Sequence, residues 1–130
     1  MSIFDSEDFK PLEKIAGRAV ISITSSGISF SKQAVSKLSY ANYVQVFVSR
    51  SKKILGVRAC EENSPNAIKF VNQDKKRVDY VRWNNADFTK EINSIATPEA
   101  IKSGYKVEGE FIEEEKALLF DFSKLEIIDN

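Results

Sequence analysis

Short runs of alternating apolar and polar residues dominate the first half of the chain. The clearest run covers residues 19–24, where Ile21 and Ile23 share one side of an extended segment. Gly27 follows this run and indicates a turn. Residues 49–53 are polar and few enough to form a hairpin loop. The pattern predicts strands at residues 19–24, 28–30, 43–48 and 54–59.

Three short segments each follow a residue suited to cap a helix, and the first two also show helical spacing of apolar residues. Ser31 precedes the first segment, Asn84 or Asn85 the second, and Thr97 with Pro98 the third. A side-chain oxygen at such a position accepts hydrogen bonds from the free N–H groups of the first turn. The predicted helices span residues 31–38, 84–96 and 97–104, and a short helix or irregular lid is expected at 1–17.

The second half of the chain holds further β-type runs. The runs at 67–71 and 78–83 flank a charged stretch at 72–77, and this pattern predicts a hairpin. A C-terminal hairpin is also predicted, with Glu113, Glu114 and Glu115 at its turn. Its strands and a short tail are expected at residues 105–112, 117–122 and 125–128.

These elements predict a single α+β domain over residues 1–130, with a mainly antiparallel sheet of short strands and hairpins and two or three short helices. The strand runs are separated by tight turns and lack the long crossover helices that parallel strands need. With 130 residues, 42% apolar and 29% charged, the chain fits one core. Its expected parts are the N-terminal lid or short helix (1–17), the basic core segment (18–60), a hairpin and helix (61–104) and the acidic C-terminal hairpin (105–130).

The composition excludes several chemistries. Histidine is absent and Cys60 is the only cysteine, so no structural zinc site, Ser-His-Asp triad or Cys-His pair can be assembled. We therefore expect no catalytic residues, no metal and no cofactor. The start of the chain does not resemble a secretory signal, and no apolar run is long enough to cross a membrane, which favours a cytoplasmic protein without membrane contact. Cys60 is expected to be a buried thiol.

The formal net charge is zero, yet the charges are segregated along the chain. Residues 18–60 contain seven basic residues and no acid, whereas residues 105–130 contain eight acids and three lysines. A positive patch attracts phosphates whatever the total charge, so the basic segment predicts weak binding of duplex nucleic acid. The predicted contact residues are Lys32, Lys37, Arg50, Lys52, Lys53 and Arg58. Alternatively, the two segments pack together and neutralise each other across neighbouring strands.

Aromatic and acidic residues allow two interpretations each. The nine Phe, four Tyr and single Trp could stack on bases, but core packing explains most of them better, and Tyr40 is the one expected to be exposed. The acids from Glu113 to Glu115 are interpreted as a solvated turn rather than a metal site, because neighbouring side chains diverge at a hairpin tip. Asp121 is either a buried acid or a strand residue that points to solvent.

The order of elements over residues 19–59 resembles the swapped-hairpin module of AbrB-like regulators and antitoxins. In that family two chains interlace their hairpins into a dimer, and basic residues on its surface contact DNA. The family usually places Arg after the turn glycine and Pro before the helix, where this chain has Ile28 and Ser31. Lys32 is the basic residue in a comparable place. The matching segments are Ile21-Ser22-Ile23, Gly27-Ile28-Ser29-Phe30-Ser31, Ala34-Val35-Ser36-Lys37-Leu38 and Tyr43-Val44-Gln45-Val46.

The sequence therefore favours a small non-catalytic binding module, with nucleic acid as the expected ligand of residues 18–58. The alternative is a protein-interaction or structural module with no nucleic-acid role. A homodimer is expected from the resemblance and from the open edges that several short strands would leave in a monomer.

Overall fold

Nine strands in the described part of the chain form one sheet in which every pairing is antiparallel. The computed structural model describes residues 18–71 and 81–128. The segment expected at 1–17 and the charged turn expected at 72–77 lie outside these ranges. The strands are β1 (Val20–Thr24), β2 (Gly27–Phe30), β3 (Tyr43–Ser49), β4 (Ile54–Cys60), β5 (Ile68–Lys69), β6 (Val81–Trp83), β7 (Tyr105–Ile112), β8 (Ala117–Asp121) and β9 (Glu126–Ile127).

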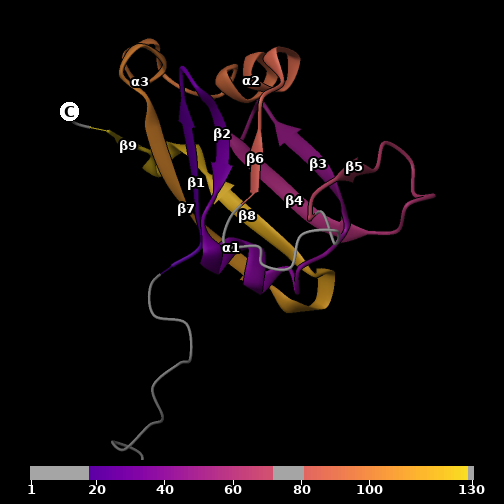
Figure 1. The fold of residues 1–130 in the computed structure, drawn as a ribbon. Coiled ribbons are helices and arrows are strands. Elements are labelled where there is room, and N and C mark those ends of the chain that lie inside the picture. Colours follow the sequence, from indigo (N-terminus) through magenta and orange to yellow (C-terminus); the bar gives the residue numbers. More distant parts are fainter. Residues whose placement is uncertain (1–17, 72–80, 129–130) are drawn as a thin grey trace, which may run out of the picture.

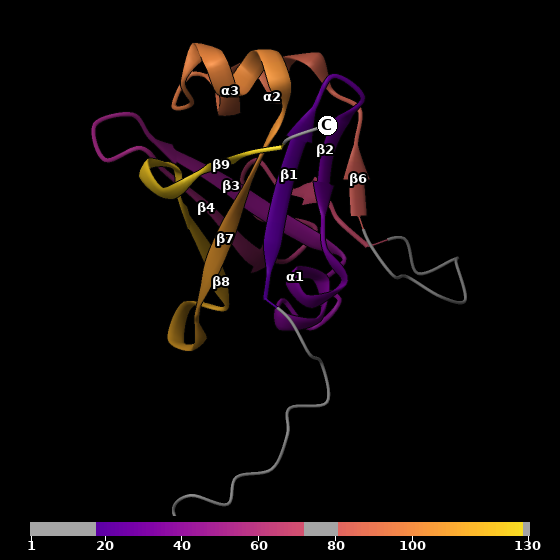
Figure 2. The same ribbon diagram turned by 90° about the vertical axis from the view of Figure 1, so that its left-hand side faces the viewer.

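The sheet runs in the order β5-β3-β4-β8-β7-β1-β2-β6, and β9 pairs with β7. The first half of β7 pairs with β1 and the second half with β8. Gly109 lies at the change of partner, and its N–H donates to the carbonyl of Ala19 at 2.8 Å. Because β7 pairs with β1 along its first half and with β8 along its second half, the sheet is not flat and curls into a half-barrel (Figures 1 and 2).

The described helices cover the two ends of this curled sheet. They are α1 (Lys32–Lys37), α2 (Ala86–Asn93) and α3 (Pro98–Ser103), with short 3₁₀ turns η2 (Glu113–Glu115) and η3 (Phe122–Lys124) beside β8. Helix α1 lies at one end, and α2 and α3 lie at the other (Figures 1 and 2). Ser31 caps α1 as predicted, because its Oγ accepts from the N–H of Ala34 at 3.3 Å. Asn85 and Thr97 cap α2 and α3 in the same way.

Aromatic side chains join the two edges of the sheet inside the core. The Phe30 ring on β2 lies 5.1 Å from that of Phe70, which follows β5, and 4.9 Å from that of Trp83 on β6. These are edge-to-face contacts, the arrangement that aromatic quadrupoles favour. Phe70 and Trp83 are themselves 6.0 Å apart. The aromatic cluster therefore fills the interior between edge strands β5 and β6.

The structure confirms a mainly antiparallel α+β fold with short strands and three short helices in the described ranges. The β3–β4 and β7–β8 hairpins are present where the pattern predicted them. In the described parts of the predicted hairpin between 67–71 and 78–83, β5 and β6 are not paired with each other, since β5 pairs with β3 and β6 pairs with β2. Cys60 is half-buried rather than buried. Among the described residues, no helix has the length and apolar character needed to cross a membrane.

Candidate binding surface

The six basic residues predicted to contact nucleic acid do not gather on one face. Lys32 and Lys37 are exposed on α1, at one end of the sheet. Arg50, Lys52 and Lys53 lie in the β3–β4 turn at the other end, beside α2 (Figure 1). The remaining residue, Arg58, is on β4 between these ends. The predicted site is therefore divided into a pair of cations on α1 and a separate group along the β3–β4 hairpin.

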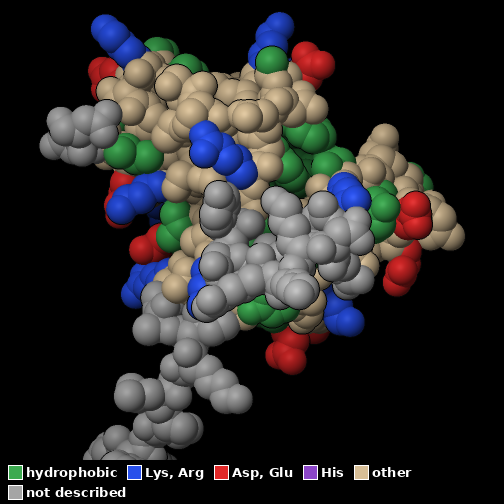
Figure 3. All heavy atoms as spheres, in the orientation of Figure 1, with side chains coloured by type: hydrophobic (Ala, Val, Ile, Leu, Met, Phe, Trp, Pro, Cys, Tyr) green, Lys and Arg blue, Asp and Glu red, His purple; other side chains and the backbone are tan. Residues whose placement is uncertain are grey.

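Three ion pairs within the described ranges join basic residues of segment 18–60 to acids elsewhere. They are Arg18–Glu108 at 2.8 Å, Arg50–Glu91 at 3.0 Å and Arg58–Glu115 at 3.6 Å. Two of these acids, Glu108 and Glu115, belong to the C-terminal segment. They lie beside basic residues because β1 pairs with β7 and β4 pairs with β8. Charges of both signs are interspersed on the face that Figure 3 shows. The basic and acidic segments thus lie side by side and are partly paired, as the alternative interpretation expected, although such exposed pairs are individually weak.

A row of three residues crosses the outer face of β3, β4 and β8, on the side away from the core. Phe47 lies opposite Gly56, and Gly56 lies opposite Leu119 on the next strand. The Phe47 side chain is 48% exposed and that of Leu119 37% exposed. A Cβ at Gly56 would lie 3.5 Å from Cδ2 of Leu119 and 3.7 Å from Cβ of Phe47. Gly56 is therefore the floor of a shallow depression between two exposed apolar side chains.

This row lies in a groove of about 470 Å³ with charged residues around it. Lys52 borders the groove at the β3–β4 turn, and Arg58 and Glu115 border it near the opposite end. The guanidinium carbon of Arg58 lies 5.0 Å from the Phe47 ring centroid, and its Nη2 donates to Oε1 of Gln45 at 2.8 Å. These contacts place Arg58 over β3 and support the Phe47 ring.

Charges of both signs lie across this outer face. Arg58 on β4 donates to Gln45 on β3 and also pairs with Glu115 in the β7–β8 turn, while Asp121 lies on β8. Asp121 also caps η3, because its Oδ1 accepts from Ser123 N–H at 3.0 Å and from Ser123 Oγ at 2.6 Å. These hydrogen bonds hold the pKa of the Asp121 carboxyl below its ordinary value, so the group stays ionised at neutral pH.

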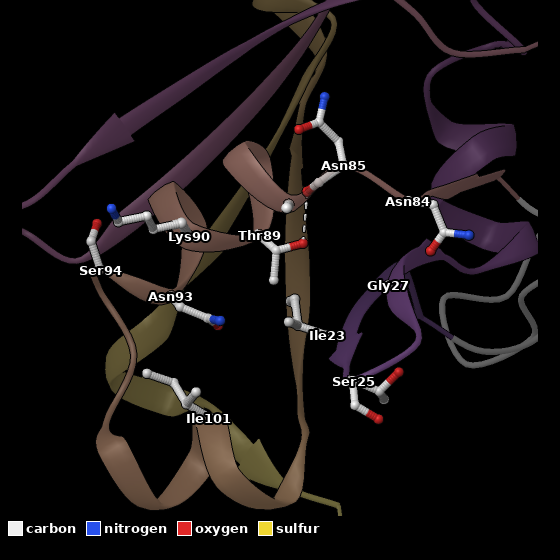
Figure 4. A pocket seen from close by; sticks show the side chains of 12 residues that line it. Ile23, Ser25, Gly27, Asn84, Asn85, Thr89, Lys90, Asn93, Ser94 and Ile101 are labelled. Atoms are coloured by element: carbon white, nitrogen blue, oxygen red, sulfur yellow. Dashed lines mark hydrogen bonds between the residues drawn. The ribbon is translucent and has the colours of Figure 1, made fainter.

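A second hollow, of about 860 Å³, lies between α2, α3 and the β1–β2 turn (Figure 4). Its lining is rich in amides and hydroxyls, but several of these groups already support the fold. Asn85 accepts from the N–H groups of Asp87 and Phe88, and Asn93 Oδ1 accepts from the Tyr105 hydroxyl at 2.7 Å. Most polar groups that line this hollow therefore serve the fold, because they cap α2 or fix α2 to β7.

The other sequence candidates have definite places in the structure. Tyr40 is exposed, as predicted. Glu113, Glu114 and Glu115 form the exposed η2 turn, as the solvated-turn interpretation expected. Asp121 is half-buried on the outer face rather than buried in the core. Within the described ranges, no three carboxylate or thiol side chains lie close enough to hold a metal ion.

Sequence reasoning missed the outer-face row because it expected Tyr40 to be the exposed aromatic residue and most of the others to pack in the core. The run from residue 43 to 48 is apolar on both sides, which resembles a strand covered on both faces. One available signal was Gly56 within the following β-type run, since a strand glycine often marks a place that another surface approaches closely. The residues opposite Gly56 on the two neighbouring strands could not be known before the pairing register of the sheet was known.

The chain matches no family model, no curated protein and no solved structure. The resemblance of residues 19–59 to AbrB-like modules therefore stays a prediction.

Proposed function

We propose that this chain is a non-catalytic protein-interaction module that binds through the outer face of β3, β4 and β8. The observation that carries the proposal is the row Phe47, Gly56 and Leu119, in which an exposed aromatic ring borders a glycine depression. A cytoplasmic location, expected from the sequence, is part of the same proposal.

The composition of the outer face supports a protein partner. Protein interfaces are enriched in aromatic residues and arginine at their centres and have polar rims. Phe47 and Arg58 provide the central aromatic residue and arginine, and Lys52 and Glu115 provide the polar rim. The acids on the β8 side would repel a phosphate backbone that crossed the whole face. A protein can offer both apolar contacts and charges of both signs, so it fits this surface better than a polyanion does.

The proposal is tested by differential capture with the full chain. Wild type, Phe47→Glu and the control Ile101→Glu are immobilised, since Ile101 is 44% exposed but lies on α3, away from the outer face. Proteins retained by wild type and the control but lost with Phe47→Glu are identified, purified and titrated by calorimetry. We expect binding to be at least about tenfold weaker with Phe47→Glu, because a charge would replace a central apolar contact. Retention of the same proteins by all three chains would contradict the proposal.

A second candidate, binding of single-stranded nucleic acid, rests on one local observation. Arg50, Lys52 and Lys53 share the β3–β4 turn, at the end of the strand that carries exposed Phe47. Cations beside an exposed aromatic ring form the usual combination for phosphate contact with base stacking. This site would use only the β3 side of the outer face and would leave Lys32 and Lys37 without a role.

A further inference from the structure

We infer that the hollow between α2, α3 and the β1–β2 turn is a second binding site, for a small organic molecule with one carboxylate and a short apolar chain. This inference goes beyond the proposed function, because the hollow and the groove of the outer face share no lining residue. The volume of the hollow, about 860 Å³, lies within the range of small-molecule sites in proteins. The chemistry of the lining indicates the ligand.

Asn93 presents hydrogen-bond donors to the floor of the hollow. Its Oδ1 accepts from the hydroxyl of fully buried Tyr105 at 2.7 Å. That bond fixes the orientation of the amide, because its oxygen is the atom that can accept a hydrogen bond. The Nδ2 group is left for the hollow, and Figure 4 shows the Asn93 side chain directed into it. The floor therefore offers two N–H donors that bind no described residue.

Lys90 is the only charged residue among the described residues that line the hollow. It is exposed on α2 and forms no ion pair with a described acid. Of the acids nearby on the same helix, Asp87 lies outside the lining, and Glu91 pairs with Arg50 at 3.0 Å. The described lining thus carries a positive charge that no acid of the lining neutralises, so it attracts an anion.

The N-terminus of α2 does not supply an anion site of its own. Asn85 Oδ1 already accepts from the N–H groups of Asp87 and Phe88 at 2.9 and 3.2 Å. With this end of the helix capped, the described lining offers one cation among neutral amides and hydroxyls. A single negative charge fits this set better than a doubly charged phosphate, and a carboxylate can accept from both Lys90 and Asn93.

Apolar groups complete the lining and indicate the rest of the ligand. Ile101 on α3 is 44% exposed, and Ile23 on β1, which is 2% exposed, closes the floor. Figure 4 shows Ile23, Thr89 and Ile101 around the Asn93 amide. A short alkyl chain next to the carboxylate would contact Ile101 and the methyl group of Thr89. The ligand class is therefore a short-chain organic acid.

The walls of the hollow are held by the fold, so the site exists before a ligand binds. The β1–β2 turn packs closely on Asn84, since a Cβ at Gly27 would lie 2.7 Å from Asn84 Oδ1. On the opposite wall, the hydrogen bond between Tyr105 and Asn93 ties α2 to β7. A preformed site loses less conformational freedom on binding, which favours affinity for a small ligand.

Titration of the full chain with hexanoate, followed by amide NMR at pH 7 and low salt, tests the inference. We expect a Kd on the order of 1 mM, with the largest shifts at Ser25, Thr89 and Asn93. Hexanamide keeps the alkyl chain but lacks the charge, whereas acetate and inorganic phosphate keep a charge but lack the chain. Each of these three probes is expected to bind at least about fivefold more weakly than hexanoate.

Asn93→Asp is the most specific variant, because it keeps the oxygen that accepts from Tyr105 and replaces the Nδ2 donors with a negative charge. Hexanoate should then bind at least about tenfold more weakly. The matched control Asn63→Asp, in the loop after β4, should bind like wild type. Lys90→Met is expected to weaken binding about fivefold, whereas Lys102→Met, at an exposed position on α3, should have no effect.

Three results would overturn the inference. They are the absence of shifts in the hollow with hexanoate at about 20 mM, equal binding of hexanoate and any of the three other probes, and unchanged binding by Asn93→Asp. Phe47→Glu should bind hexanoate like wild type, because Phe47 lies outside this lining. Loss of hexanoate binding would therefore leave the proposed function of the outer face undecided, and loss of Phe47-dependent capture would leave the hollow undecided.

Discussion

Gly109 lies directly opposite Phe120 in the β7–β8 register, and a methyl group on Gly109 would come within 2.6 Å of the Phe120 ring. The ring is fully buried and lies against the strand backbone where a side chain would otherwise be. Gly109 is also the point at which β7 changes its partner from β1 to β8. The curl of the sheet and the packing of its core therefore depend on the same glycine.

We predict that Gly109→Ala destabilises the fold, because the buried ring must move to admit the methyl group. The expected loss in the free energy of unfolding is about 1–3 kcal/mol, the usual range for an overpacked core. Urea unfolding followed by circular dichroism measures this loss. Gly56→Ala is the matched control, since its methyl group would make contacts of 3.5 Å and longer. An equal loss in the two variants would contradict the role assigned to Phe120.

Tyr105→Phe is predicted to destabilise the fold by about 1 kcal/mol at neutral pH. The Tyr105 hydroxyl is buried with its ring and donates to Oδ1 of Asn93 at 2.7 Å, which ties α2 to β7. The substitution removes that hydrogen bond, while half-buried Asn93 can be rehydrated, so the expected loss is moderate. Thermal unfolding of both chains at pH 7 measures the difference.

Alkaline pH should reduce and then reverse this difference. Burial raises the pKa of the Tyr105 phenol above its ordinary value of 10.0. The phenol therefore stays neutral in the folded chain when it ionises in the unfolded chain, and wild type loses stability as the pH rises above about 10. Tyr105→Phe lacks this loss. Parallel stability curves for the two chains from pH 8 to 11 would show that Tyr105 is not the group responsible.

Asn85→Ala is predicted to weaken α2, with a loss of about 1 kcal/mol in unfolding free energy. The Asn85 side chain accepts from the N–H groups of Asp87 and Phe88 at 2.9 and 3.2 Å. The neighbouring change Asn84→Ala is the control, because Asn84 does not cap the helix. Denaturant titration compares the two, and the cap assignment is wrong if Asn84→Ala has the larger effect.

Local patterns predicted the strands and helices well because their determinants are close together in the chain. The alternation around Ile21 and Ile23 and the capping residue Ser31 act within a few residues, and the structure agrees with both. Within the 67–71 and 78–83 runs, β5 and β6 pair with β3 and β2 and not with each other, for a physical reason. Phe70 N–H bonds to the carbonyl of Asn42 at 2.7 Å, and the Phe70 ring packs on Phe30, so long-range contacts determine the partner of β5.

The candidate surface was less predictable because it depends on register. Lys52 and Arg58 were identified from charge alone, and both border the groove. Phe47 and Leu119 become neighbours only through Gly56, whose pairing with both strands is a property of the folded sheet. Charge segregation along the chain also could not show that Arg58 would lie 3.6 Å from Glu115.

Binding of single-stranded nucleic acid, the second candidate function, should depend on the β3–β4 turn. With about three phosphates neutralised by Arg50, Lys52 and Lys53, the logarithm of affinity for a single strand should fall against the logarithm of salt with a slope of about −2. Fluorescence anisotropy with a labelled oligonucleotide measures this slope. Lys52→Glu with Lys53→Glu should flatten it, whereas Lys32→Glu with Lys37→Glu should leave it unchanged. Absence of binding at tens of micromolar protein in low salt would reject this candidate.

The most direct test of the outer face is amide NMR of the wild-type chain titrated with a protein that it captures and that Phe47→Glu fails to capture. Binding changes the environment of the residues at the interface, so their resonances shift while those elsewhere stay in place. We predict that the largest shifts occur on β3, β4 and β8, centred on Phe47, Gly56 and Leu119. Shifts confined to α1 or to the cleft between α2 and α3, with the outer face unchanged, would contradict the account.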